Sequence, residues 1–417
     1  MNAHILKSRI KGTIKAIPSK SYTHRALICA ALSKGESIIS NVVYSEDIVA
    51  TISGIKAIGA EVIEVNSTTL KVIGFKNETS RYFNAKESGT TMRMFMPIVA
   101  ALIDSEFIIY GEGNLLNRPQ HGFDGILKYT KTIEYVKVMS FEDKSLYELN
   151  GNISSQFVSG LLYALPLLDK PKIIRVLKPF VSHDYVYMTI NMLGLFGVKI
   201  EIHEEEDYVS YSLVEGSFYQ ATNYIVEGDY SNAAFFMVLG ALAGEVIIEG
   251  LNLNSLQGDM KIINILREVG VNIQTKKNGI SFSKPKVYNS FEADMSIYPD
   301  LGPILSILAL FTPRARLYNI NVLRYKESDR VKSIVQLLKG VGSIFELDDN
   351  EIIIHHRKLT IKDLIVDSGY DHRICMSGVV LGLIYPLVVL NIECVKKSYP
   401  SFFIDVKKVN GKFTYDR

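Results

Sequence analysis

The feature that most constrains the fold of this chain is a pattern that recurs six times along its 417 residues. Each copy opens with a short polar step rich in Ser, Gly or Asp and continues into a long apolar run containing Ala, Leu and Met. The polar steps lie at residues 19–21, 88–90, 154–156, 229–231, 299–300 and 371–372, and successive copies are 66 to 76 residues apart. A fixed period of this kind is typical of a chain built from one repeated structural unit.

A second pattern, in step with the first, is a helical segment that closes on glycine and precedes an apolar strand. Glycine is a common residue just past a helix because it adopts the left-handed conformation freely. These glycines are Gly59, Gly197, Gly270, the pair Gly340 and Gly342, and Gly411, while the copy expected near residue 128 lacks one. Each unit therefore reads strand, helix, strand, helix, strand, strand, which predicts an α/β fold of six βαβαββ units. Ordinary α/β alternation and an open solenoid remain alternatives.

The composition argues against several classes of protein. Lys and Arg number 46 against 44 Asp and Glu, and a net charge of +2 argues against a protein that coats nucleic acid. Three cysteines without a C-x-x-C pair indicate a reducing compartment and no disulfide framework. The sequence shows neither the apolar leader of a secreted protein nor a run long enough to span a bilayer. We therefore expect a cytoplasmic, multi-domain globular protein without nucleic-acid or membrane partners.

The unusual residues gather where the first helix of each unit is expected to begin. A helix start presents free N–H donors and a partial positive charge, so it is suited to bind anions. Ser, Thr and Asp at such places are also ordinary helix caps, which is the simpler explanation for any one of them. Capping does not explain the non-capping residues that recur beside these starts, namely Lys20, Arg25, Arg93, Gln156 and Arg373. This arrangement favours sites for phosphate or carboxylate groups.

Nine short motifs follow one another along the chain, and each alone is modest evidence. They are Pro18-Ser19-Lys20-Ser21 with Arg25, Ser88-Gly89-Thr90-Thr91-Met92-Arg93, Asn117-Arg118-Pro119, Ser154-Ser155-Gln156-Phe157 with Ser182 and Tyr185, Gln257-Gly258-Asp259, Pro299-Asp300, Lys326-Glu327-Ser328-Asp329-Arg330, Asp371-His372-Arg373 and Lys397-Ser398-Tyr399-Pro400. Around the seventh motif we expect a strand end with Arg324 and Lys326 on one face, and a following helix capped by Ser328. Together and in this order, the motifs resemble the 5-enolpyruvylshikimate-3-phosphate synthase family of enolpyruvyl transferases over essentially the whole chain.

The resemblance implies a two-domain inside-out α/β barrel with three βαβαββ units in each domain. One domain would be discontinuous, formed by residues 1–13 and 228–417 on the phosphoenolpyruvate side. The other would be residues 14–227, on the shikimate 3-phosphate side. The chain would cross between them near Gly12 and Gly228, which we expect to act as hinges, and helix starts of both domains would face one cleft.

The implied reaction transfers the enolpyruvyl group of phosphoenolpyruvate to the 5-hydroxyl of shikimate 3-phosphate, with release of phosphate. It proceeds by addition and elimination through a tetrahedral intermediate, in the shikimate pathway to chorismate and the aromatic amino acids. The implied partners are these two small molecules, acted on by a monomer. Neither a metal ion nor an organic cofactor is implied.

The resemblance also implies roles for individual residues. The base and the proton-transfer group would be Asp300 and Glu327, with Lys20 assisting. Shikimate 3-phosphate would be bound by Lys20, Ser21, Arg25, Ser154, Ser155, Gln156, Ser182, Tyr185, Asp300 and Lys326. Phosphoenolpyruvate would be bound by Lys20, Gly89, Arg118, Gln156, Glu327, Arg330, Arg373 and Lys397. Supporting roles would fall to Thr90, Arg93 and His372, with Arg93 serving geometry more than contact.

Several departures from the family pattern affect what can be carried over. Glu87-Ser88 stands where Asn-Ala is common, which leaves sensitivity to glyphosate open, and Val322 stands where some members have a substrate-binding Asn. Cys375 replaces a common Ala, which we interpret as helix packing. The nearest alternative is the enolpyruvyl transferase acting on UDP-N-acetylglucosamine, but its loop cysteine has no counterpart between Gly111 and Arg118. A non-catalytic or RNA-end-binding βαβαββ repeat protein is the alternative from another class.

Overall fold

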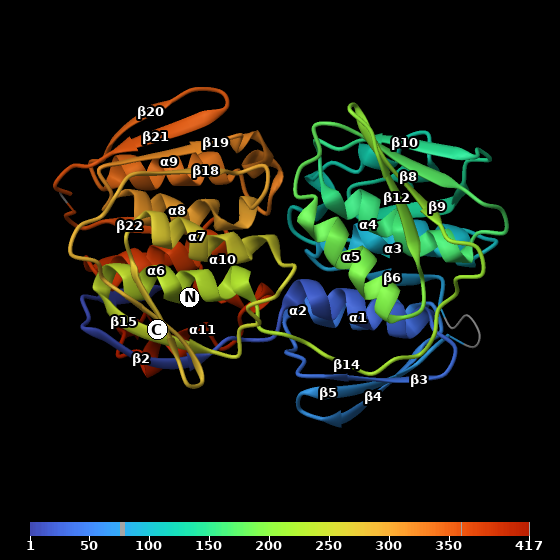
Figure 1. Cartoon of the computed structure of the whole chain (residues 1–417), viewed down its shortest axis with the longest axis horizontal. Helices are drawn as coiled ribbons and strands as arrows, with labels where there is room; N and C mark the ends of the chain where they lie inside the picture. Colours follow the sequence, from blue (N-terminus) through green and yellow to red (C-terminus); the bar gives the residue numbers. More distant parts are fainter. Residues whose placement is uncertain (76–79, 360, 417) are drawn as a thin grey trace. The chain divides into compact units, whose positions relative to one another are not determined.

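The chain folds as two compact units in the computed structural model, which describes residues 1–75, 80–359 and 361–416 (Figure 1). The discontinuous unit comprises Met1–Ile17 and Gly228–Arg417, and the continuous unit comprises Pro18–Glu227. Gly12, near which a hinge is expected, lies inside a strand opposite Val246. A Cβ there would lie 2.3 Å from the Lys408 carbonyl oxygen, so glycine at this position permits close packing.

Three modules form the continuous unit. In chain order its elements are α1 (Lys20–Leu32), β3 (Glu36–Ser40), α2 (Glu46–Ala57), β4 (Glu61–Asn66), β5 (Thr69–Ile73), β6 (Tyr82–Asn84), α3 (Gly89–Leu102), β7 (Phe107–Tyr110), η1 (Leu115–Asn117), η2 (His121–Phe123), β8 (Leu127–Lys131), β9 (Tyr135–Phe141), β10 (Leu146–Asn150), α4 (Ser155–Ala164), η3 (Leu165–Leu167), β11 (Ile173–Leu177), α5 (Asp184–Leu195), β12 (Ile200–Glu204), β13 (Tyr208–Leu213) and β14 (Tyr224–Ile225).

Three further modules form the discontinuous unit. Its elements are β1 (Ala3–Leu6), β2 (Ile10–Lys15), α6 (Tyr230–Ala243), β15 (Gly244–Glu249), η4 (Gly258–Lys261), α7 (Ile262–Glu268), β16 (Asn272–Lys276), β17 (Gly279–Ser283), β18 (Phe291–Asp294), η5 (Pro299–Leu301), α8 (Gly302–Ala309), β19 (Arg314–Tyr318), η6 (Ile320–Tyr325), α9 (Arg330–Gly340), β20 (Ile344–Leu347), β21 (Glu351–His355), β22 (Ile365–Asp367), α10 (His372–Gly382), β23 (Leu387–Leu390), η7 (Ile392–Lys397), α11 (Phe402–Lys408) and β24 (Lys412–Tyr415).

All six four-stranded sheets found among the described residues share one strand order. The first strand of a module pairs parallel with the second, and the fourth strand lies antiparallel between the second and the third. The sheet β18-β19-β21-β20 shows this order within a continuous stretch of chain. The predicted sixfold repeat is therefore confirmed, and five of the six modules contain both helices of the βαβαββ pattern.

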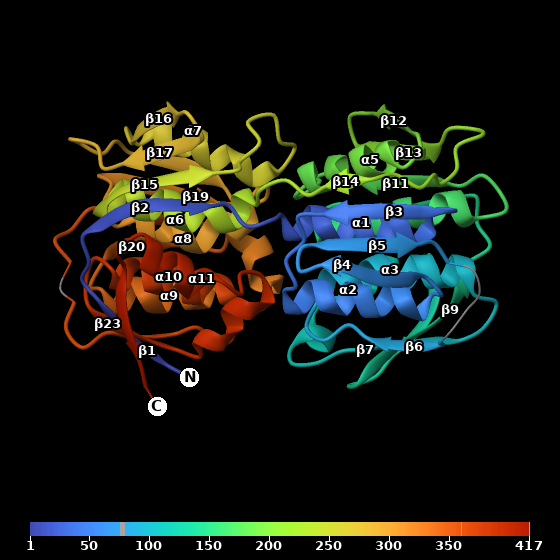
Figure 2. The same cartoon turned by 90° about the horizontal axis from the view of Figure 1, so that it is seen from below.

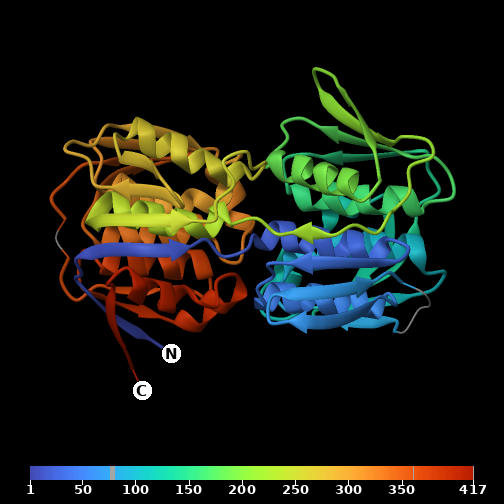
Figure 3. The same ribbon diagram turned by 60° about the horizontal axis from the view of Figure 1, so that its bottom comes forward.

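Three strands reach their modules from distant parts of the sequence. Strand β14 pairs parallel with β3 and supplies the first strand of the first module, as Figure 2 shows. Strand β2 pairs parallel with β15 in the same role in the fourth module, where the two strands lie side by side in Figure 3. Strand β1 lies between β23 and β24 and completes the last module.

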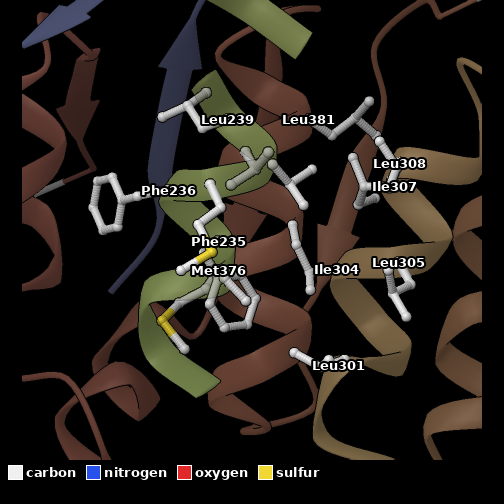
Figure 4. Packing of buried hydrophobic residues seen from close by; sticks show 14 of the residues in the cluster. Phe235, Phe236, Leu239, Leu301, Ile304, Leu305, Ile307, Leu308, Met376 and Leu381 are labelled. Carbon is white, nitrogen blue, oxygen red and sulfur yellow. The ribbon is translucent and has the colours of Figure 1, made fainter. Parts of the chain in front are cut away.

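The first helix of each module forms the core, and the sheets lie outside it. In the discontinuous unit the side chains of α6, α8 and α10 meet, among them Phe235, Ile304 and Met376 (Figure 4). Every residue of α6 from Tyr230 to Leu242 is buried, which explains why these segments read as continuous apolar runs. The second helices are amphipathic instead, since α9 buries Val331 and other residues of one face while it exposes the opposite face.

The helix-ending glycines agree with the sequence except in two modules. Backbone angles of φ +98°, +83°, +93° and +67° occur at Gly59, Gly197, Gly270 and Gly342. In the second module η1 and η2 take the place of a second helix, and Gly125, with φ +70°, precedes β8. The glycine sought near residue 128 therefore lies three residues earlier. In the last module the left-handed residue is Asn410, with φ +65°, rather than Gly411.

Close contact between α3 and α4 depends on one glycine. A Cβ on Gly160 would lie 2.5 Å from the backbone oxygen of Arg93, whereas a Cβ on Gly194 in α5 would meet nothing within 4 Å. We expect Gly160→Ala to destabilise the protein by about 1–3 kcal/mol through overpacking. The control Gly194→Ala is expected to stabilise it by about 0.5–1 kcal/mol, because alanine is the better helix former. Denaturant unfolding followed by circular dichroism measures both; equal effects of the two changes would contradict this account.

Candidate active site

Several predicted site residues lie at the starts of the buried first helices, and five of the six such starts in the described residues carry a side-chain cap. Ser19, Ser88 and Ser154 each accept a backbone N–H at the beginning of α1, α3 and α4. Asp229 and Asp371 do the same for α6 and α10. The capping interpretation therefore holds for these five residues. The first helical residues are the predicted site residues Lys20, Gly89, Ser155 and His372, and Asp300 lies in η5 just before α8.

Arg25 in α1 is buried, with 2 % of its surface exposed, and is held by three neutral oxygens. Its guanidinium donates to the Thr189 hydroxyl at 2.9 Å and to the carbonyl oxygens of Ser21 and Tyr185 at 2.8 Å each. It also lies 5.9 Å from the centre of the Tyr185 ring. These bonds fix the guanidinium without neutralising its charge, so Arg25 remains suited to an anionic ligand. Ser182, whose carbonyl oxygen accepts from the Tyr185 amide at the start of α5, has a left-handed backbone with φ +54°.

Lys20 forms an ion pair that the sequence reasoning missed. Its ammonium donates to Asp47 Oδ2 at 2.7 Å, and both side chains are largely buried. Asp47 lies in the first turn of α2, which is capped by Ser45. The signal was present in the sequence, because Ser followed by two acidic residues is a typical helix start. The pairing of Asp47 with Lys20 could not be predicted from the sequence, because it depends on how α1 packs against α2.

A chain of buried hydroxyl groups joins three helices through a histidine. His24 Nδ1 lies 2.6 Å from Thr51 Oγ1, which lies 2.7 Å from Thr91 Oγ1, and Thr91 in turn lies 2.8 Å from the cap residue Ser88. Burial, with smaller contributions from Lys20 and the neighbouring arginine, holds the pKa of His24 well below its usual value. His24 is therefore neutral at physiological pH and acts as a hydrogen-bonding link between α1, α2 and α3.

Arg93 in α3 connects Gln156 to the loop that carries Arg118. It donates to Gln156 Oε1 at 2.8 Å and to the Pro119 carbonyl oxygen at 2.8 Å. Gln156 Nε2 donates in turn to Thr90 Oγ1 at 2.9 Å. Three of the predicted residues, Arg93, Gln156 and Thr90, are thus joined in one hydrogen-bond network, and a bond to the neighbouring Pro119 links it to Arg118.

The discontinuous unit gathers three carboxylates around one buried arginine. Arg330 has a side chain with 0 % exposure. Its NH1, NH2 and Nε groups donate to Asp300, Glu327 and Asp371 at 2.8, 2.7 and 2.8 Å respectively. Asp371 is itself fully buried and caps α10. Removing either member of such a buried pair typically costs about 3–5 kcal/mol, because a charge is left without a partner.

Asp300 is shared between two arginines. Its second carboxylate oxygen accepts from Arg373 NH2 at 2.9 Å, while the first accepts from Arg330. Burial alone would raise the pKa of Asp300, but Arg373, Lys326 and Arg330 outweigh it and hold the pKa well below its usual range. Asp300 is therefore ionised, and a quarter of its side chain is exposed. Lys397, in the same unit, is also buried, and its ammonium donates to the Tyr370 carbonyl oxygen at 2.8 Å.

Two expectations around Arg330 were wrong. The helix α9 is capped by Asp329, whose side chain accepts the Lys332 amide. Ser328 donates its hydroxyl to Asp371 instead. The preceding segment is the 3-10 helix η6, so Arg324 and Lys326 do not lie on a strand end. The helical turn was missed because the alternation of Arg324 and Lys326 was interpreted as the two-residue period of a strand.

The two remaining departures pack against the core. Val322 lies in η6 as a partly buried side chain against the hydrophobic cluster, with the exposed Asn321 beside it. Cys375 is fully buried in α10, and burial raises the pKa of its thiol well above its usual value. The packing interpretation of Cys375 agrees with this placement.

Two features are absent from residues 1–75, 80–359 and 361–416. In these ranges, three or more His, Cys, Asp or Glu side chains do not come together in an arrangement that could hold a metal ion. Nor do these residues include a helix with the length and apolar character needed to cross a membrane.

The buried histidine generates a prediction about stability and pH. The unfolded chain binds a proton at His24 below about pH 6.5, whereas the folded chain does not. The free energy of unfolding should therefore fall as the pH drops below about 6.5, by up to about 1.4 kcal/mol per pH unit for this group, with no contribution above that pH. His24→Asn keeps a polar group facing Thr51 and removes this dependence. Unfolding measured from pH 4.5 to 8 tests it.

The exposed His121 of the same unit provides the control. His121→Asn should leave the pH dependence of unfolding as it is in the unmodified chain. A His24→Asn curve parallel to that of the unmodified chain between pH 4.5 and 6.5 would contradict the buried neutral state of His24.

Comparison with known proteins places this geometry in a family. Residues 6–406 match the family described as EPSP synthase (3-phosphoshikimate 1-carboxyvinyltransferase). A relative of that name from Clostridium kluyveri is 38% identical over 97% of this chain and 96% of its own length. One from Clostridium acetobutylicum is 40% identical over 96% of each.

Solved structures agree on the fold. An EPSP synthase from Acinetobacter baumannii, 23% identical, superposes over 100% of both chains with a TM-score of 0.80. The enolpyruvyl transferase NikO from Streptomyces tendae, 12% identical, covers 100% of this chain and 98% of its own with a TM-score of 0.77. The predicted two-domain inside-out α/β barrel is thereby confirmed. Because the family match covers nearly the whole sequence, the chain belongs to the EPSP synthase family.

Proposed function

We propose that this chain transfers the enolpyruvyl group of phosphoenolpyruvate to the 5-hydroxyl of shikimate 3-phosphate and releases phosphate. The observation that carries the proposal is the likeness to curated relatives named 3-phosphoshikimate 1-carboxyvinyltransferase over 96% or more of both chains. The protein would act as a cytoplasmic monomer on these two substrates and without a cofactor.

The continuous unit supplies suitable chemistry for a phosphorylated, hydroxyl-rich ligand. Its helix starts carry neutral serine caps, which leave the partial positive charge of the helices in place. The Arg25 guanidinium donates to the neutral oxygens of Thr189, Ser21 and Tyr185, so its full charge remains available. These properties support binding of shikimate 3-phosphate to this unit.

Asp300 is proposed as the base for the reacting hydroxyl. The C–O bond forms as the hydroxyl proton passes to its carboxylate, while the methylene carbon of phosphoenolpyruvate takes up a proton. Loss of that proton and departure of phosphate then restore the double bond in the product. Asp300 is ionised and partly exposed, as a base must be. Glu327 is proposed to move the methylene proton, with Lys20 assisting.

Arg330 has a different role in this proposal from the one implied by resemblance alone. Its side chain is fully buried and bonded to three carboxylates, so it positions Asp300 and Glu327 relative to each other. Direct contact of Arg330 with phosphoenolpyruvate stays a prediction.

The substrate assignment is tested by phosphate release. We expect the purified chain to release phosphate from phosphoenolpyruvate when shikimate 3-phosphate is present and not when UDP-N-acetylglucosamine replaces it. Each substrate omitted in turn is the control. Release with UDP-N-acetylglucosamine alone, or with neither acceptor, would refute the proposal.

The acid–base assignment is tested by Asp300→Ala and Glu327→Ala. Each should lower kcat by roughly 10²–10⁴-fold, the usual contribution of a proton-transfer group. Binding of shikimate 3-phosphate, measured by calorimetry, should remain close to that of the unmodified chain. Asp300→Asn is measured as well, because it keeps the size of the side chain if the alanine variant fails to fold. The exposed Asp349 of the same unit provides the matched control, and Asp349→Ala should be fully active. Turnover within threefold of the unmodified rate in the first two variants would defeat the assignment.

A further inference from the structure

We propose that Arg93 is a positioning residue, which fixes the Gln156 amide and the Arg118 loop so that both present only hydrogen-bond donors to the ligand. This inference rests on the proposed function and deepens it, because it states how the continuous unit would recognise an oxygen-rich anion. In this role Arg93 acts on the ligand through Gln156 and Arg118 and not by direct contact.

Arg93 joins three separate segments of the continuous unit. It lies on α3 and is 2 % exposed. Its NH1 group donates to Gln156 Oε1 at the start of α4, and its NH2 group donates to the carbonyl oxygen of Pro119, each at 2.8 Å. The central carbon of the guanidinium lies over the Phe157 ring, 4.9 Å from its centre, where cation–π attraction adds to the hydrogen bonds.

The bond to Arg93 determines which way the Gln156 amide faces. A guanidinium has donors and no acceptor, so the amide atom that it contacts must be the oxygen. The amide nitrogen then faces the other way, and one of its two N–H groups donates to Thr90 Oγ1 at 2.9 Å. The second N–H group of the amide is the one that Gln156 would offer to a ligand. A reversed amide would bring N–H against N–H at Arg93, so this orientation is strongly preferred.

The second bond positions Arg118. Pro119, whose carbonyl oxygen Arg93 binds, directly follows Arg118 in the loop between η1 and η2. Gly89, one turn before Arg93 on α3, leaves room for the same side chain, since a Cβ on Gly89 would lie 2.7 Å from Arg118 NH1. Two residues of α3 therefore determine the place of Arg118. An amide N–H and a guanidinium fixed in this way match the oxygens of a carboxylate or phosphate.

Lysine cannot replace Arg93 in this role. The two acceptors, Gln156 Oε1 and the Pro119 carbonyl oxygen, are reached by different nitrogens of one rigid fork, whose face lies on Phe157. A lysine ammonium is a single point charge on a flexible stem and has no flat face. Retaining the charge at position 93 is therefore not expected to retain the function.

The test compares Arg93→Lys and Arg93→Met with Gln156→Met and the double variant Arg93→Met/Gln156→Met. We expect each substitution at position 93 to lower kcat/KM by roughly 10–100-fold, the effect expected for losing hydrogen bonds to a charged group. Because Arg93 acts partly through Gln156, the loss in the double variant should be clearly smaller than the product of the two single losses. Gln156→Glu should keep the bond to Arg93 and the thermal midpoint but lose activity.

The matched control is Arg175→Met. Arg175 lies in β11 of the same unit, 4.4 Å from the Tyr208 ring centre, and its NH1 lies 3.3 Å from Glu148. It is another arginine over an aromatic ring, at a position to which we assign no role in binding or catalysis, so its removal should leave kcat/KM unchanged.

Three results would overturn the inference. The first is full activity of Arg93→Lys. The second is a double-variant loss within about twofold of the product of the single losses, which is what independent residues give. The third is a lower thermal midpoint in the Arg93 variants with unchanged kcat/KM. An unmodified chain that releases no phosphate with shikimate 3-phosphate would refute the proposed function itself, and the inference with it.

Discussion

Burial of the first helix of every module is the constraint on which the rest of this structure depends. A helix start has backbone N–H donors without partners inside the helix, and a buried start cannot pass them to water. Polar side chains must therefore follow the helix into the core. The serine and aspartate caps meet this need, and four of them are followed directly by the predicted site residues Lys20, Gly89, Ser155 and His372. The candidate site is thus built on positions that the fold already requires to be polar.

The two units satisfy this constraint with different chemistry. Serine caps in the continuous unit accept N–H groups without adding charge, and Arg25 and Arg93 are held by neutral oxygens. Aspartate caps occur in the discontinuous unit, where Asp371 and its neighbouring acids surround Arg330. The continuous unit therefore leaves the charge of Arg25 available for the anionic ligand that we propose. The discontinuous unit balances cations against carboxylates, which keeps Asp300 ionised in a fixed position, as the proposed proton transfer requires.

Much of this arrangement could be predicted from the sequence, because the period of the repeat and the polar helix starts are local signals. Lys20 and His372 could be placed at helix starts from the spacing alone. Their partners could not, since the pairing of Lys20 with Asp47 depends on how two helices pack. The burial of Arg330 was also hidden, because a Lys-Glu-Ser-Asp-Arg run looks like a surface loop until its carboxylate partners from η5 and α10 are known. The absence of a second helix from the second module had only one sign in the sequence, which was the missing glycine near residue 128.

The strands borrowed from distant parts of the sequence affect how the protein is made. Strand β1 pairs with β23 and β24, so Ala3–Leu6 is synthesised long before Lys412–Tyr415, the later of its two partner strands. At a synthesis rate of roughly 5–20 residues per second, this delay lasts on the order of 20–80 s. During that time the first strands of the chain have open edges, which readily pair with other chains. The continuous unit, whose last strand β14 ends at Ile225, can close before the second half of the discontinuous unit exists. Translation order therefore favours completing the middle of the chain before its two ends meet.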